Sequence, residues 1–296
     1  MGVIAMNQTT VVTETATAAQ ALDRISVRPP YFDLGAMEEL GDGIVVAEVA
    51  PAPTSDPEVG AIEAAQVARH LAILGSCAAA LTRDDDARHH YLATRAHYTR
   101  LSNAPASVDG PLRAEAIASW SDRRSARALV KLSTESGQGL NLLDVEYTVL
   151  SPKMFLRFNP PIEAADGAES VVDHGGEPAA PTELPFEVDK IEDGVRVDCG
   201  PVPASLCAGH FPDYPAAPVA IVMGQLCRAA GLAMNRHLGC PDGRYRIEEG
   251  HVTASKLARA GQQLVLEARY RKPVRGGHQL RGVALADGEV VGELEV

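Results

Sequence analysis

Residues 209–231 read GHFPDYPAAPVAIVMGQLCRAAG, and this stretch decides the fold. His210 and Phe211 stand just ahead of three prolines, and an apolar run with helical character follows the last of them, Pro218. Proline suits the start of a helix, because the N–H that it lacks would have no partner there. The pattern therefore predicts a histidine held rigidly at the mouth of a buried helix.

The composition indicates a chain that can build a substantial core. It has 296 residues, of which 46% are hydrophobic and 22% charged, and its formal net charge is −12. This length allows one large domain or two domains of ordinary size. The acidic balance argues against a nucleic acid partner, since nucleic acids favour basic surfaces that neutralise phosphates.

The cysteines and the apolar segments predict a cytoplasmic protein. Five cysteines form an odd set without CxxC spacing, which is typical of reduced thiols. The Thr- and Ala-rich start lacks a signal-peptide pattern, and we expect residues 1–25 to be disordered. The apolar run over residues 61–81 is interrupted by charged and polar side chains, which indicates a buried helix and no membrane span.

The two halves of the chain repeat one plan. GDGIVVAEVAP (41–51) resembles EDGVRVDCGPV (192–202), and each is followed by a proline-bearing loop and a long apolar helix. Three pairs of glycines share one and the same separation along the chain: Gly43 and Gly194, Gly110 and Gly261, and Gly137 and Gly288. A constant separation across several elements indicates a duplicated unit.

The strand pattern predicts an α+β fold in each half. Apolar residues alternate with a period of two in successive segments joined by glycine turns, which is typical of an antiparallel meander. We expect this sheet to wrap around the single long helix of its half, because that helix is apolar on nearly every face. The predicted units are residues 26–158 and 184–296, with a Pro-, Gly- and acid-rich linker at 159–183.

The stretch 209–231 resembles the G-H-F-P-x-x-P-x-x-P motif of the β-hydroxyacyl-ACP dehydratases of fatty acid synthesis. The closing residues 260–296 resemble the same family, and the likeness covers most of 184–296 and, more weakly, about 35–150. The resemblance implies a hotdog fold, here a double hotdog. It also implies that each site takes a histidine from one unit and an acid from the other.

The family's acid stands at a fixed spacing after its histidine, and the position at that spacing from His210 is Gly224. Matching Pro57 of the first half with Pro218 places Glu63 opposite Gly224, and the same spacing counted back from Glu63 reaches no histidine. Each half therefore carries the group that the other lacks. The resemblance predicts one composite site of His210 and Glu63; the alternative is a core histidine and a partly buried helix glutamate.

These two side chains suit the removal of water from a 3-hydroxyacyl thioester. Imidazole takes a proton from Cα near neutral pH, and a protonated carboxyl donates to the departing hydroxyl. The helix of Glu63 is predicted to start at Asp56 and Pro57, so that its first amides bind the thioester oxygen. The predicted substrate-binding residues are Glu58, Val59, Gly60, Phe211, Tyr214 and Pro218.

We expect neither a metal nor an organic cofactor. His89, His90 and His97 have no ligand spacing with a nearby acid cluster. Basic side chains gather at residues 244–275, either as solvated strand edges or as a patch that docks an acidic acyl carrier protein. The resemblance also allows a homodimer of double hotdogs.

Two further functions stay open. A hotdog acyl thioesterase would release the free acid and thiol, and a non-catalytic acyl-binding partner subunit would bind the chain without turnover. Polyketide dehydratases are similar in plan, but they carry the histidine in the first half, whereas this chain carries it in the second.

Overall fold

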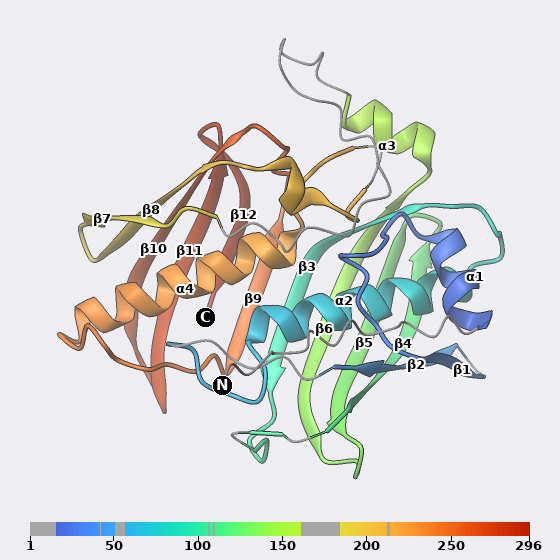
Figure 1. Ribbon diagram of the computed structural model, residues 1–296, viewed down its shortest axis with the longest axis horizontal. Helices are drawn as coiled ribbons and strands as arrows, with labels where there is room; N and C mark the ends of the chain where they lie inside the picture. The colour runs from blue at the N-terminus through green and yellow to red at the C-terminus, as the bar shows by residue number, and fades with distance from the viewer. Residues whose placement is uncertain are drawn as a thin grey trace, which may run out of the picture.

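In the computed structural model, one curved antiparallel sheet covers two long helices (Figure 1). The structure describes residues 16–41, 43–50, 57–105, 107–108, 110–160, 184–211 and 214–296. The helices are α1 (Ala16–Arg24), α2 (Ala64–Leu81), α3 (Pro152–Phe158) and α4 (Val219–His237), with a 3-10 turn at Ala204–Cys207. The strands are β1 (Met37–Gly41), β2 (Ile44–Val49), β3 (His90–Arg100), β4 (Leu112–Asp122), β5 (Ser125–Thr134), β6 (Gly139–Leu150), β7 (Glu187–Ile191), β8 (Gly194–Pro201), β9 (Glu249–Ala254), β10 (Gln263–Val274), β11 (Gly277–Ala286) and β12 (Glu289–Glu295).

The strand order is the same from each edge of the sheet to its centre. The order is β1-β2-β4-β5-β6-β3-β9-β12-β11-β10-β8-β7, so β3 and β9 pair where the two halves of the chain meet. Gly110 and Gly261 both have a left-handed φ, at +93° and +85°, and so do Gly137 and Gly288, at +86° and +80°. Two of the three glycine pairs found in the sequence thus occupy equivalent turns.

The two long helices lie across the inner face of the sheet (Figure 1). Small residues allow this close approach, since a Cβ on Gly75 of α2 would lie 2.5 Å from the Tyr147 hydroxyl. That hydroxyl donates to the carbonyl of Ala72 at 2.6 Å. By length and composition α2 could also cross a membrane, but 67% of it is buried inside the fold.

The predicted disordered segment 1–25 contains the helix α1, which corrects that prediction for residues 16–25. Ala18, Ala21 and Ile25 are spaced on one side of α1 and are buried. Arg24 donates to the carbonyl of Ala80 at 3.1 Å, near the C-terminal end of α2. Residues 1–15 and most of the predicted linker, 161–183, lie outside the described residues.

Helix α2 starts later than the sequence predicts. Its first residue is Ala64, and Glu63 precedes it as the N-cap with an extended ψ of 138°. The preceding segment is held in a bridge, because Val59 N–H donates to the Tyr245 carbonyl at 2.8 Å and Tyr245 N–H donates to Pro57 at 3.1 Å. The predicted cap, Asp56, lies outside the described residues. Residues 57–63 therefore form a non-helical segment where the first helical turns were expected.

Candidate functional site

The loop before α4 carries His210 against the segment that follows α1. Gly209 has a φ of +75°, and its carbonyl accepts from Arg28 N–H at 2.7 Å. His210 forms an antiparallel bridge with Val27, and its own N–H donates to Cys207 at 3.0 Å. The backbone is therefore fixed on both sides of the histidine, which is 8% exposed.

The surroundings of His210 keep its ring neutral, with one nitrogen able to accept a proton. Nδ1 lies 3.0 Å from the Ala216 carbonyl, and because a carbonyl only accepts, Nδ1 carries the proton and Nε2 a lone pair. Burial lowers the pKa of His210 to about 4, although the hydrogen bond to Ala216 opposes this shift. The ring stacks on Phe211 at 4.0 Å and meets Tyr31 edge-on at 5.2 Å. At neutral pH the ring is therefore uncharged and Nε2 has a free lone pair.

A cavity of about 640 Å³ opens beside His210. Helix α2 contributes a run of small apolar side chains to its wall, at Ala65, Ala68 and Ala72. Tyr91 also lines it, and the Tyr91 hydroxyl is buried without a hydrogen-bond partner among the described residues. A volume of this size and an apolar wall suit an extended acyl chain.

The structure does not bring Glu63 to this cavity. Glu63 is not among the described residues that line it. The charge of Glu63 instead contributes to the raised pKa values of Glu58, Cys227 and Tyr245. The pairing of Glu63 with His210 across one substrate therefore remains a prediction from the sequence resemblance.

The starts of the two long helices give an alignment of the two halves that differs from the one in which Pro57 matches Pro218. Helix α2 begins at Ala64 and α4 at Val219. With these helix starts aligned, Gly224 corresponds to Arg69 instead of Glu63. The two alignments differ because residues 57–63 are not helical: Val59 and Tyr245 are joined by a backbone hydrogen bond there, so Glu63 precedes α2 whereas Gly224 lies within α4.

Helix α2 places no carboxylate on the wall of the cavity, within the described part of the chain. Arg69 instead points its guanidinium toward Asp33, 3.2 Å away, and over the ring of Tyr31. Apart from Ser76, the side chains that α2 contributes to the wall are apolar, so this helix supplies no acid to the cavity.

Of the six predicted substrate-binding residues, Pro218 is the N-cap of α4 and is not among the described residues that line the cavity, and the other five fall into two groups. Phe211 and Tyr214 line the cavity, as the sequence predicts, and the Tyr214 hydroxyl accepts from Arg259 at 3.3 Å. Glu58, Val59 and Gly60 are not among the described residues that line it. The Val59 amide is engaged with Tyr245, and the Glu58 carboxylate accepts from Ala64 N–H at 2.8 Å. This second group supports the start of α2.

The helix that begins at the wall of the cavity is α4, whereas the sequence predicted this role for the helix of Glu63. Pro218 is the N-cap of α4, and the next two residues, Val219 and Ala220, line the cavity. The first amides of a helix have no acceptor within it, and the helix dipole makes this end favourable for negative charge. Tyr31 is a further wall residue that the sequence analysis missed, since no motif marks a tyrosine so far before His210 in the chain.

Glu58 makes the stability of the protein depend on pH. Burial raises the pKa of Glu58 to about 7. The hydrogen bond from Ala64 N–H opposes this shift, and the charge of Glu63 adds to it. Because the folded value lies above the unfolded one, this contribution is present at pH 4.5 and is lost as the pH rises through 7. We expect Glu58→Gln to remove that loss, measured by urea unfolding at pH 5 and pH 8. An unchanged pH dependence in Glu58→Gln would contradict this role.

Comparison with known proteins gives a sequence match over part of the chain and structural matches over most of it. No family model matches the chain. It is 33% identical over 91 residues to the 3-hydroxyacyl-(acyl-carrier-protein) dehydratase FabZ of Vibrio atlanticus, covering 30% of this chain and 61% of that protein. The FabZ of Tolumonas auensis is 32% identical over 91 residues and is covered to 60%. The chain thus matches about three fifths of the length of these relatives.

Three solved structures resemble almost the whole chain. An acyl-ACP thioesterase from Bacteroides thetaiotaomicron has a TM-score of 0.53 and 13% identity, over 86% of this chain and 97% of that one. The 12:0-ACP thioesterase from Umbellularia californica has a TM-score of 0.54 and 11% identity, over 90% and 98%. A protein of unknown function with hot dog fold from Alicyclobacillus acidocaldarius has a TM-score of 0.51 and 13% identity, over 91% and 97%. These likenesses show that the chain has the hotdog fold.

Proposed function

We propose that this chain is a double hotdog dehydratase that removes water from a 3-hydroxyacyl thioester carried on acyl carrier protein. The observation that carries the proposal is the orientation of His210, whose Nδ1–H is held by Ala216 so that Nε2 keeps its lone pair beside an apolar cavity. The partial similarity to the FabZ dehydratases supports it. The equal strand order of the two halves supports a fused pair of hotdog units.

In the proposed reaction, Nε2 of His210 takes the proton from Cα of the substrate. The electrons of that C–H bond form the double bond, the bond from Cβ to the hydroxyl breaks, and the imidazolium returns its proton to the departing oxygen as water. The amides of Val219 and Ala220 stabilise the thioester oxygen while it carries negative charge. One imidazole serves both transfers if they occur on the same face of the substrate.

This scheme differs from the composite site in its source of acid. Glu63 remains the donor that the sequence resemblance implies, but it is not among the described residues that line the cavity. We therefore assign both proton transfers to His210, and the comparison of Glu63→Gln with a His210 variant separates the two schemes.

Thioester hydrolysis is the second candidate. The same histidine can activate a water molecule, and the same amides can hold the oxygen of a tetrahedral intermediate. The thioesterases among the similar structures favour this candidate through their fold, at no more than 15% identity.

Product analysis tests the proposal directly. The chain is incubated with 3-hydroxyoctanoyl thioesters of acyl carrier protein and of coenzyme A, and the intact carrier is weighed by mass spectrometry. Dehydration removes one water and leaves the acyl group attached, which is the expected result. Release of the free thiol would favour the thioesterase, and binding without turnover would favour an acyl-binding subunit; either outcome overturns the proposal.

A further inference from the structure

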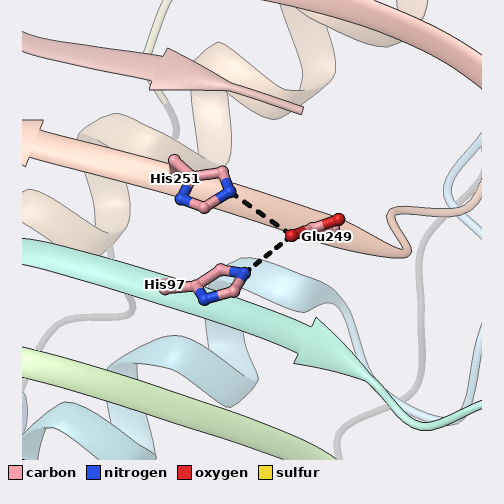
Figure 2. A group of neighbouring side chains, drawn as sticks. All are labelled: His97, Glu249 and His251. Atoms are coloured by element: carbon pink, nitrogen blue, oxygen red, sulfur yellow. Dashed lines mark hydrogen bonds and ion pairs between the residues drawn. The ribbon is translucent and has the colours of Figure 1, made fainter. Parts of the chain in front are cut away.

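Two histidines and a glutamate meet on the outer face of the sheet, where its two halves join (Figure 2). His97 lies on β3, and Glu249 and His251 lie on β9. His97 and His251 are directly opposite in the strand register, and their rings stack with centroids 4.2 Å apart. Glu249 and His251 are next-but-one neighbours on β9, so both side chains project from the same face of that strand.

The ligand atoms of these three side chains already converge. The Oε1 atom of Glu249 lies 2.8 Å from Nε2 of His97 and 3.3 Å from Nε2 of His251, and the three atoms lie within 4.8 Å of one another. Ligands at zinc distances of about 2.0–2.1 Å in a tetrahedron are separated by about 3.3 Å. Small side-chain rotations therefore suffice to place one ion between the three atoms, without movement of the backbone.

The neighbouring strands surround this cluster with acids. Asp144 of β6 is opposite His97, and Glu295 of β12 is opposite His251, so acid, histidine, histidine and acid follow one another across the sheet. Asp144 pairs with Arg127, and Glu295 accepts from Gln279 at 2.5 Å.

We propose that His97, Glu249 and His251 bind a divalent transition-metal ion of the zinc class, with water in the fourth position. Two imidazoles and one carboxylate suit zinc, whereas calcium and magnesium prefer oxygen ligands alone. The next residues along the strands, Ala96 and Val252, line the cavity on the opposite face. The ion would thus be separated from the substrate by the thickness of the sheet.

The proposed ion links the two halves of the fold. β3 belongs to the first half and β9 to the second, and they pair at the centre of the sheet. An ion held by side chains of both strands stabilises the folded state, because the unfolded chain does not hold the three ligands together. The proposed metal site does not depend on the reaction at His210, and each is tested by its own experiment.

Calorimetric titration of the untagged chain with zinc chloride tests the proposal. We expect one equivalent to bind and the melting temperature to rise with zinc, but not with magnesium. His97→Ala and His251→Ala should each bind at least about tenfold more weakly, since even the loss of supporting contacts around a metal site costs about 10–100-fold. Glu249→Gln keeps the side-chain shape and should also bind more weakly.

Two matched variants exclude binding elsewhere. Cys240 is the exposed thiol of the described residues, and His278 is a strand histidine that contacts Tyr270 at 3.2 Å. Cys240→Ser and His278→Ala should bind zinc as tightly as the unchanged chain. Circular dichroism of each metal-free variant checks that it is folded. The proposal is overturned if the unchanged chain shows no saturable zinc binding. It is also overturned if the folded variants His97→Ala and His251→Ala bind zinc as tightly as the unchanged chain.

Discussion

Replacing His210 by glutamine is expected to lower kcat for dehydration by about 10²–10⁴-fold, the usual contribution of a general acid–base residue. Glutamine fills a similar volume and can still donate to the Ala216 carbonyl, which now receives Nδ1–H at 3.0 Å. It has no nitrogen that accepts a proton near neutral pH. The rate of enoyl thioester formation, followed by mass spectrometry, measures the loss.

Glu63→Gln is the matched comparison for this experiment. If Glu63 only precedes α2 as its N-cap, the variant keeps near-normal turnover, as we expect. An equal loss in both variants would instead support the composite site that the sequence resemblance implies. Near-normal turnover in His210→Gln would reject the histidine mechanism altogether.

The pH profile gives an independent readout of the same residue. An ordinary histidine has a pKa of 6.5, but burial lowers that of His210 to about 4. The unprotonated form of His210 is therefore present well below pH 6. We expect the fall of kcat/KM at acid pH, which reports the protonation of this residue, to occur only below about pH 6. Unfolded chains protonate this side chain at 6.5, so its contribution to stability is lost as the pH falls from 6.5 toward 4.

The sequence predicts the architecture well, because the strand signals are local. Alternation with a period of two and glycine turns mark most of the strands, and Gly110 and Gly137 have a left-handed φ like that of Gly261 and Gly288. The predicted start of α2 was wrong for the opposite reason. Its preceding segment is set by hydrogen bonds to Tyr245, far along the chain, which no local pattern reveals.

The histidine cluster shows the same limit at a second place. His97 and Glu249 are separated by 152 residues, so neither belongs to a short ligand motif. The segment around His97 by itself indicates no metal site. Only the pairing of β3 with β9 places the ligands on one face, and that pairing depends on how the two halves meet.

Gly209→Ala is expected to lower the free energy of unfolding by about 2–4 kcal/mol, the combined cost of an overpacked contact and a strained left-handed residue. A Cβ on Gly209 would lie 2.2 Å from the Arg28 carbonyl oxygen and 2.9 Å from the backbone of Pro29. Backbone atoms cannot turn aside as a flexible side chain can. The φ of +75° adds strain for any residue with a Cβ. Urea unfolding measures the difference from the unchanged chain.

Gly276→Ala separates the two causes of this loss. Gly276 has a similar φ of +86°, but a Cβ there would meet nothing within 4 Å, so this variant loses only the strain energy of about 1–2 kcal/mol. The excess loss in Gly209→Ala measures how firmly the segment after α1 holds the loop of His210. Because Gly209 adjoins His210, the folded variant should also lose turnover, whereas Gly276→Ala keeps it. Equal losses of stability in the two variants would mean that this loop yields to the added methyl group, and that the histidine is less rigidly held than its hydrogen bonds indicate.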